Sequence, residues 1–184
     1  MYSEVLYTEC QSGKAAAEEY LGGVRKNISN DRPLIGPYGV NQEGSGDMYT
    51  KGASVVHMVR HILGDEKFKA MLLEMQRRFR HQVVTSAQLE AFMNSYSEND
   101  LTPLFDQYLR TTQVPQLEWG VANKQLLARW TNCIDTFRMQ VRITMNGKPM
   151  LTTIGRDWKV IATGKVKKAK ICLLYTSPSP RDRG

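Results

Sequence analysis

Two histidines in the middle of the chain have a spacing that metal sites use. His57 and His61 are four residues apart, so on a helix their imidazoles lie on one face. The catalytic form of this motif has a glutamate directly after the first histidine as general base, and here that position is Met58. No carboxylate follows at a spacing that supplies an obvious third ligand. We therefore predict no metal ligands in this chain.

Tyr49 is the second candidate for chemistry, because a phenol can donate a hydrogen bond to an oxygen on which negative charge develops. Such a donor accelerates a reaction when it binds the transition state more tightly than the ground state. A tyrosine at the start of a helix is otherwise an ordinary packing residue with one polar end. The residue type alone leaves both interpretations open.

The residues around Tyr49 resemble a known signature. The string Tyr49-Thr50-Lys51-Gly52-Ala53 resembles the Tyr-x-Lys-Gly-Ala motif of the zinc aminopeptidases of the aminopeptidase N and leukotriene-hydrolase family, which are gluzincins. The resemblance covers Met1 to about Trp158, and the order of its motifs is more specific than any one of them. Further matching strings are Asn30-Asp31-Arg32-Pro33, Leu63-Gly64-Asp65-Glu66-Lys67-Phe68 and the stretch from Leu101 to Pro115.

The zinc ligands of that family are not found in this sequence. Family members bind zinc through a His-Glu-x-x-His helix and a downstream glutamate, which precede the residues equivalent to Met1-Tyr2. We therefore expect a fragment that begins after the last metal ligand, with zinc in the parent protein and none bound by the fragment. The resemblance implies peptide substrates, attack by zinc-activated water, and Tyr49 as the group that stabilises the oxyanion. A non-catalytic helical scaffold derived from the same fold is the alternative.

One helix must position Tyr49, and it is predicted from Asp47 to Asp65. Asp47 is suited to cap its N-terminus, and Gly64 is suited to end it in a left-handed conformation. Gly52 is predicted to permit close helix packing, and Lys51 to be structural. Apolar residues at helical spacing predict one buried stripe, opposite a face that carries both histidines. The stripe is Met48, Gly52, Val55, Val59, Ile62 and Leu63, and the opposite face is Thr50, Ser54, His57 and His61.

The other elements predict an α+β protein with the helices first. Further helices are expected over residues 1–11, 14–24 and 66–80, after a capping box at Thr85 and Gln88, and from Thr102-Pro103. Residues 26–46 are rich in glycine and proline and are expected to be irregular. The resemblance makes this segment the wall of a substrate cleft, and a plain surface loop is the alternative.

Beyond Val114-Pro115 the pattern changes to short alternating runs. Strands are predicted over residues 116–121, 125–131, 137–145 and 158–162, with a hairpin turn at Asn146-Gly147. The pattern predicts a chain that is mainly α at first and then β. The resemblance implies that the helices are the C-terminal helical half of a thermolysin-like catalytic domain and the strands a partial β-sandwich with an open edge.

The expected domain limits are 1–113 for the helical part, 114–165 for the truncated β-sandwich and 166–184 for a disordered basic tail. Within that tail, residues 172–182 resemble a translated sequencing adapter and are excluded from the fold prediction.

Composition and charge limit the classes of function. The chain is 41% hydrophobic and 23% charged, which is ordinary for a globular protein, and it contains no apolar run of membrane-spanning length. Its net charge of +7 is concentrated in the last twenty residues, on a tail rather than on a folded face, which argues against nucleic-acid binding. The three cysteines have neither metal-ligand nor redox spacing and indicate no particular compartment.

Overall fold

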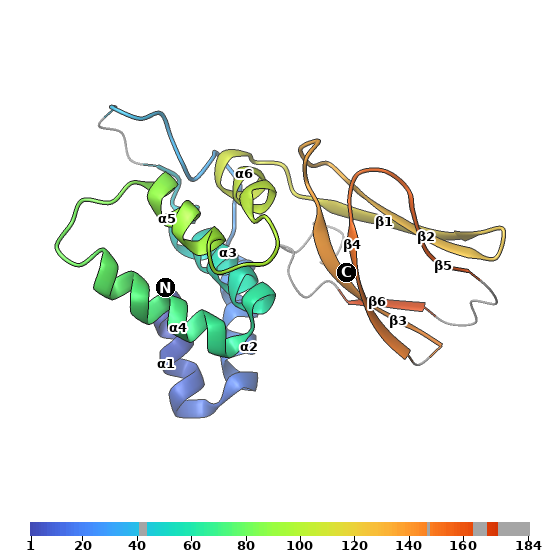
Figure 1. Ribbon diagram of the computed structural model, residues 1–184, viewed down its shortest axis with the longest axis horizontal. Coiled ribbons are helices and arrows are strands. Elements are labelled where there is room, and N and C mark those ends of the chain that lie inside the picture. Colours follow the sequence, from blue (N-terminus) through green and yellow to red (C-terminus); the bar gives the residue numbers. More distant parts are fainter. Residues whose placement is uncertain (41–43, 147, 164–168, 173–184) are drawn as a thin grey trace. The chain divides into compact units, whose positions relative to one another are not determined.

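The computed structural model describes residues 1–40, 44–146, 148–163 and 169–172. In this part of the chain six helices are followed by six strands (Figure 1), which confirms the predicted α+β class. The chain divides into two compact units, Met1–Thr112 and Gln113–Gly184, beside the change of sequence pattern at Val114. The adapter-like segment lies outside the described residues except for Cys172.

Two glycines separate four of the helices. Gly13 has φ 87° and Gly64 has φ 80°, values that cost glycine little and strain other residues, so one helix ends and the next begins at each, as predicted for Gly64. None of the helices in the described part of the chain is both long and apolar enough to cross a membrane. The helices are α1 (Tyr2–Ser12), α2 (Lys14–Arg25), α3 (Asp47–Leu63), α4 (Asp65–Arg78), α5 (Ser86–Asn94) and α6 (Thr102–Arg110).

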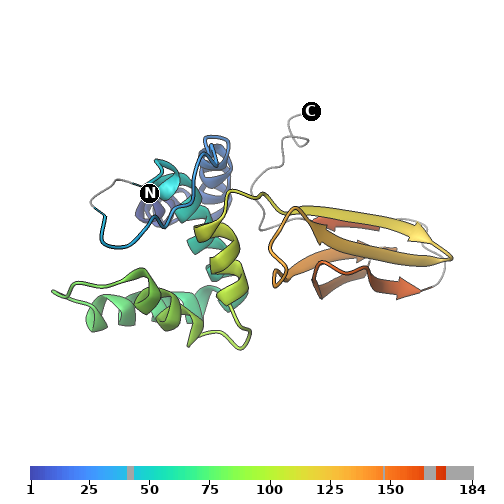
Figure 2. The same ribbon diagram turned by 90° about the horizontal axis from the view of Figure 1, so that it is seen from above.

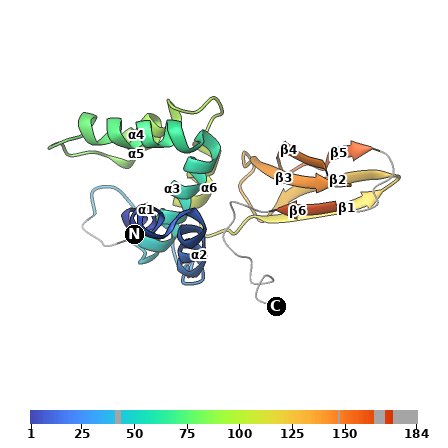
Figure 3. The same ribbon diagram turned by 90° about the horizontal axis from the view of Figure 1, so that it is seen from below.

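Helix α3 is the centre of the helical unit and packs against α1, α2, α4 and α6. In Figure 3, α3 and α6 lie between the α1–α2 pair and the α4–α5 pair. The predicted single stripe is therefore wrong in part: Val55 and Val59 are buried, but Ser54 is buried as well and Met48 is exposed. A helix with neighbours on several sides buries more than one face, whereas the stripe assumed a single covered side.

A buried arginine of α3 links three helices. Arg60 donates hydrogen bonds to both carboxylate oxygens of Glu9 in α1, at 2.5 and 2.8 Å, and to Asp65 at the start of α4, at 2.7 Å. These hydrogen bonds hold the pKa of Asp65 at about 2 and also lower the pKa of Glu9. The arrangement fixes the orientation of α3 relative to α1 and α4, because a guanidinium binds a carboxylate in a planar geometry.

The local signals for α5 and α6 are confirmed. Thr85 and Gln88 form the predicted capping box, in which the Thr85 side chain accepts from the Gln88 backbone and the Gln88 side chain accepts from the Thr85 backbone. Pro103 lies in the first turn of α6, where a missing N–H is not needed. Residues 26–40 and 44–46 contain no helix or strand, as predicted for this segment.

The second unit contains two antiparallel three-stranded sheets, in the orders β1-β2-β5 and β4-β3-β6. Figure 1 shows β1, β2 and β5 in one layer and β3 and β6 in a second, and in Figure 2, seen from above, the two layers overlap. Strands β3 and β4 pair antiparallel up to Met145 and Lys148, which confirms the predicted hairpin. The strands are β1 (Gln116–Ala122), β2 (Gln125–Thr131), β3 (Met139–Met145), β4 (Lys148–Ile154), β5 (Lys159–Thr163) and β6 (Ala169–Cys172).

Strands β4 and β6 were not predicted. Strand β4 contains Pro149, which lacks the N–H that most ladder positions need, and β4 is an edge strand where a proline is tolerated. Strand β6 lies within residues 166–184, so Ala169–Cys172 differ from the expected disordered tail. It has only four residues and is held by backbone pairing to β3, which leaves little trace in the sequence.

The core of the second unit lies between the sheets, as a partial β-sandwich requires. Trp130 of β2 and Phe137 before β3 are buried with ring centroids 5.7 Å apart. Trp119 and Val121 of β1 pair with buried residues of β2, so their side chains point to the same inner face, yet both are exposed. Within the described residues this edge of the inner face is uncovered.

Candidate active site

Tyr49 lies in the first turn of α3 with its side chain 58% exposed. Successive residues of a helix are rotated by 100°, so positions two before and two after Tyr49 lie on the opposite side of α3. Those positions are Asp47 and Lys51, whose side chains are only 4% and 1% exposed. Because both are held on the inner side, the phenol of Tyr49 is directed outward.

The surface beside Tyr49 is open in the described part of the chain. Gly52 lies three residues further on and therefore on nearly the same side of α3. A Cβ added at Gly52 would meet no atom within 4 Å, so the prediction that this glycine permits close helix packing is wrong. Met48, next to Tyr49, is also exposed. The outer side of α3 is thus open around Tyr49 in the first turn, whereas Ala53, one turn further on the same side, is buried against α1 and α2.

Asp47 does not cap its own helix, which corrects the prediction. Gly46 is at the N-cap position and no side-chain cap is formed. The carboxylate of Asp47 instead accepts the backbone N–H groups of Ser29, at 3.0 Å, and Asn30, at 2.6 Å. The loop folds back over the start of α3 and brings its own unpaired amides to the carboxylate, which satisfies them in a buried position.

Ser45 completes this attachment of the loop to α3. Its fully buried hydroxyl accepts the backbone N–H of Asp47 at 3.1 Å and donates to the carboxylate of Asp31 at 2.5 Å. The hydrogen bond from Ser45 lowers the pKa of Asp31. The two ends of the loop are therefore joined to each other and to α3 directly before Tyr49.

Lys51 anchors the next turn of α3, in keeping with its predicted structural role. Its ammonium group donates to the backbone carbonyl of Thr111 at 3.0 Å, immediately after the end of α6. Burial lowers the pKa of Lys51, while the carboxylates of Asp47 and Asp31 act in the opposite direction. A cation beside the C-terminal end of a helix is also favoured by the helix dipole.

His57 is buried and His61 is half-buried, although both were predicted on the face opposite the buried stripe. His57 is 6% exposed, its Nε2 lies 2.7 Å from Nε2 of His61, and its Nδ1 lies 3.4 Å from the hydroxyl of Tyr2. Burial, together with the neighbouring charges, lowers the pKa of His57 to about 3. In the described residues no group of three or more His, Cys, Asp or Glu side chains could hold a metal ion. The zinc that the resemblance implies therefore does not fit a site made of these residues.

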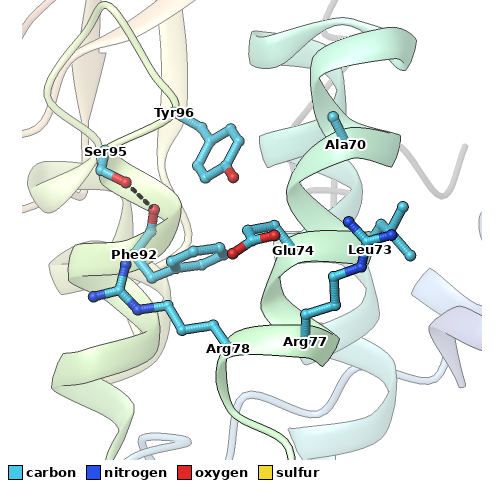
Figure 4. A pocket seen from close by; sticks show the side chains of 8 residues that line it. All are labelled: Ala70, Leu73, Glu74, Arg77, Arg78, Phe92, Ser95 and Tyr96. Atoms are coloured by element: carbon cyan, nitrogen blue, oxygen red, sulfur yellow. Dashed lines mark hydrogen bonds between the residues drawn. The ribbon is translucent and has the colours of Figure 1, made fainter.

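A separate pocket of about 600 Å³ lies between α4 and α5 (Figure 4). Neither Tyr49 nor the residues that anchor it line this pocket. Arg77 and Arg78 at the end of α4 form part of its wall. The guanidinium of Arg78 lies 5.8 Å from the ring centroid of Phe79 and 5.6 Å from that of Phe92. The lining residues are Ala70, Leu73, Glu74, Arg77, Arg78, Phe92, Ser95 and Tyr96.

Three residues hold the start of α3 beside Tyr49: Ser45, Asp47 and Lys51. Of these, only the structural role of Lys51 was predicted from the sequence. Asp47 follows a glycine-rich loop and precedes a helix, which is the pattern of a local N-cap. Only the return path of the loop shows that this carboxylate accepts amides 17 and 18 residues away. The two carboxylates beside the loop ends, Asp31 and Asp47, are the one signal that could have suggested a tied loop.

Comparison with known families gives one partial match, and the matched segment contains Tyr49. A family model described as the peptidase family M1 domain matches residues 40–108, which include α3, α4, α5 and most of α6. A search of curated proteins gave no match to the chain. The family match supports a peptidase, and so a hydrolase, in general terms, and it includes the open surface of α3 but not the β-sheet unit.

Proposed function

We propose that this chain is part of a zinc-dependent aminopeptidase that removes N-terminal residues from peptides. The observation that carries the proposal is the outward phenol of Tyr49, which lies in the peptidase-matching segment on an open and firmly anchored helix start. A packing tyrosine would be covered by neighbouring side chains, whereas Tyr49 is more than half exposed.

The role of Tyr49 in this proposal is to donate a hydrogen bond to the carbonyl oxygen of the scissile peptide bond. Negative charge develops on that oxygen as the tetrahedral state forms, so the hydrogen bond strengthens along the reaction. A donor held by a rigid helix needs no reorganisation at that moment, and Asp47 and Lys51 supply the rigidity. When bound in the parent protein, zinc supplies Lewis-acid chemistry, and we place its ligands outside the described residues, which offer no suitable set.

The first prediction concerns the metal content of the chain. We expect the purified 184-residue chain to hold no stoichiometric zinc and to show no peptidase activity, because a catalytic zinc site needs three protein ligands. Metal analysis after gel filtration measures this directly, with the His57→Gln variant as a control for the histidine pair. One tightly bound zinc per chain that disappears in His57→Gln would contradict the prediction.

The coding sequence upstream of Met1 distinguishes this proposal from a helical scaffold. A His-Glu-x-x-His string and a following glutamate in the same reading frame would provide the ligands and the general base. A complete reading frame without them would favour the non-catalytic alternative.

A further inference from the structure

The loop before α3 and the phenol of Tyr49 share one buried support. The Asp47 carboxylate receives two loop amides, and the backbone N–H of the same residue is received by Ser45. Asp47 therefore takes part in three of the hydrogen bonds that fix the loop on the helix start. Tyr49 is two residues away on the opposite side of the same turn, so a rotation of this turn would change the direction of its phenol.

The same support extends to the end of α6. The backbone N–H of Ile35, in the middle of the loop, donates to the carbonyl of Leu109 at 3.0 Å. Lys51 donates to the carbonyl of Thr111, two residues further along the chain. The loop and α3 are thus each tied to the C-terminal end of α6, independently of the contact between them.

We propose that Asp47 is a positioning residue for Tyr49, which holds the first turn of α3 and the loop segment of residues 26–31 in a fixed arrangement. This inference rests on the proposed function for its catalytic consequence, but not for its structural one. A carboxylate that accepts two N–H groups in a buried position forms charge-assisted hydrogen bonds, which are stronger than neutral ones. Removing that charge frees the turn that directs the phenol.

The decisive variant is Asp47→Asn, which keeps the shape of the side chain. An asparagine offers a single oxygen and turns an NH₂ group toward a backbone N–H, so one of the two loop hydrogen bonds is lost. We expect hydrogen exchange of the Ser29 and Asn30 amides to accelerate by about tenfold, which corresponds to the loss of one such hydrogen bond. The matched control is Asp100→Asn, because Asp100 accepts a backbone N–H from Thr102 at the start of α6.

The position of the phenol is measured in the same 184-residue chain by placing 3-fluorotyrosine at position 49. In the chain that retains Asp47 we expect one narrow fluorine resonance. The Asp47→Asn variant should give a broadened or split resonance, and the Asp100→Asn variant should give the same narrow resonance as the unsubstituted chain. An unchanged narrow resonance in Asp47→Asn would overturn the positioning role, whatever the variant does to stability. This readout does not depend on metal or on activity.

The catalytic consequence is tested in the protein extended upstream to include its metal ligands. We expect Asp47→Asn to lower kcat by about tenfold with little change in KM, and to cause no further loss when Tyr49→Phe is already present. An equal loss in both backgrounds would show that Asp47 does not act through Tyr49. If Tyr49→Phe alone leaves kcat unchanged, the proposed role of Tyr49 fails, and the fluorine resonance still decides whether Asp47 positions the ring.

Discussion

Replacing Tyr49 by phenylalanine in the metal-loaded parent enzyme is expected to lower kcat by about 10²–10³-fold, the usual effect of losing one donor to an oxyanion. The substitution removes only the hydroxyl, and Tyr49 is more than half exposed, so folding and zinc content should be retained. KM should change far less, because the hydrogen bond is proposed to form mainly in the transition state.

A series of aminoacyl anilides measures this effect, with zinc content determined on the same samples. Tyr7→Phe is the matched control, since Tyr7 is also an exposed helical tyrosine but lies on α1. Its kcat should equal that of the parent. A Tyr49→Phe enzyme that retains zinc and stays within about twofold of the parent kcat would return Tyr49 to the role of a packing residue.

The helical unit is expected to lose stability as the pH falls below 6.5, because His57 cannot take up a proton in its buried position. The folded pKa of His57 is about 3, against an ordinary value of 6.5, so between these values the unfolded chain binds a proton that the folded chain does not. The contribution of His57 is therefore complete above pH 6.5 and decreases toward acid by up to about 1.4 kcal/mol per pH unit.

The charges around His57 act with burial and not against it. Lys14 and Arg25 of α2, Arg60 of α3 and the neighbouring His61 all disfavour a second positive charge at this position. Tyr2 of α1 contacts the other ring nitrogen, and Glu18 of α2 acts on His61 in the opposite direction. Asp65 and Glu9 have lowered pKa values, so their contributions are present above their ordinary pKa near 4 and are lost only below it.

Urea unfolding followed by helical ellipticity between pH 7.5 and 4.5 separates these groups. His57→Gln should give a shallower decline than the unmodified chain over pH 6.5–4.5, whereas His81→Asn, at an exposed position with positive φ, should leave the slope unchanged. Identical slopes for the chain and His57→Gln would mean that His57 is not held neutral by its surroundings.

Most helices could be predicted because their signals are local. The glycines at 13 and 64, the Thr85–Gln88 box and Pro103 act within one turn, and each does so in the structure. The buried faces of α3 could not be predicted, because they depend on four neighbouring helices that a single period of apolar residues does not reveal. Strand β6 was missed for a similar reason, since its stability comes from pairing with β3.

In the candidate site, too, local features could be predicted from the sequence and contacts between distant residues could not. Tyr49 was selected from its neighbours in the sequence, and its place at the outer side of the helix start follows from the helical period. The support beneath it, from Asp47, Ser45 and Lys51, is made of contacts between residues far apart in the chain, and Asp47 seemed instead to satisfy a local capping rule.

The most direct test of the proposed function is the release of amino acids by the protein extended with its own upstream coding sequence. The proposal predicts stepwise loss of residues from the free N-terminus of a peptide, abolished by a chelator, restored by zinc, and absent when the N-terminus is acetylated. A folded, zinc-loaded extended protein that releases no N-terminal residue from any peptide of a mixed library would contradict the assignment and favour a non-catalytic helical scaffold.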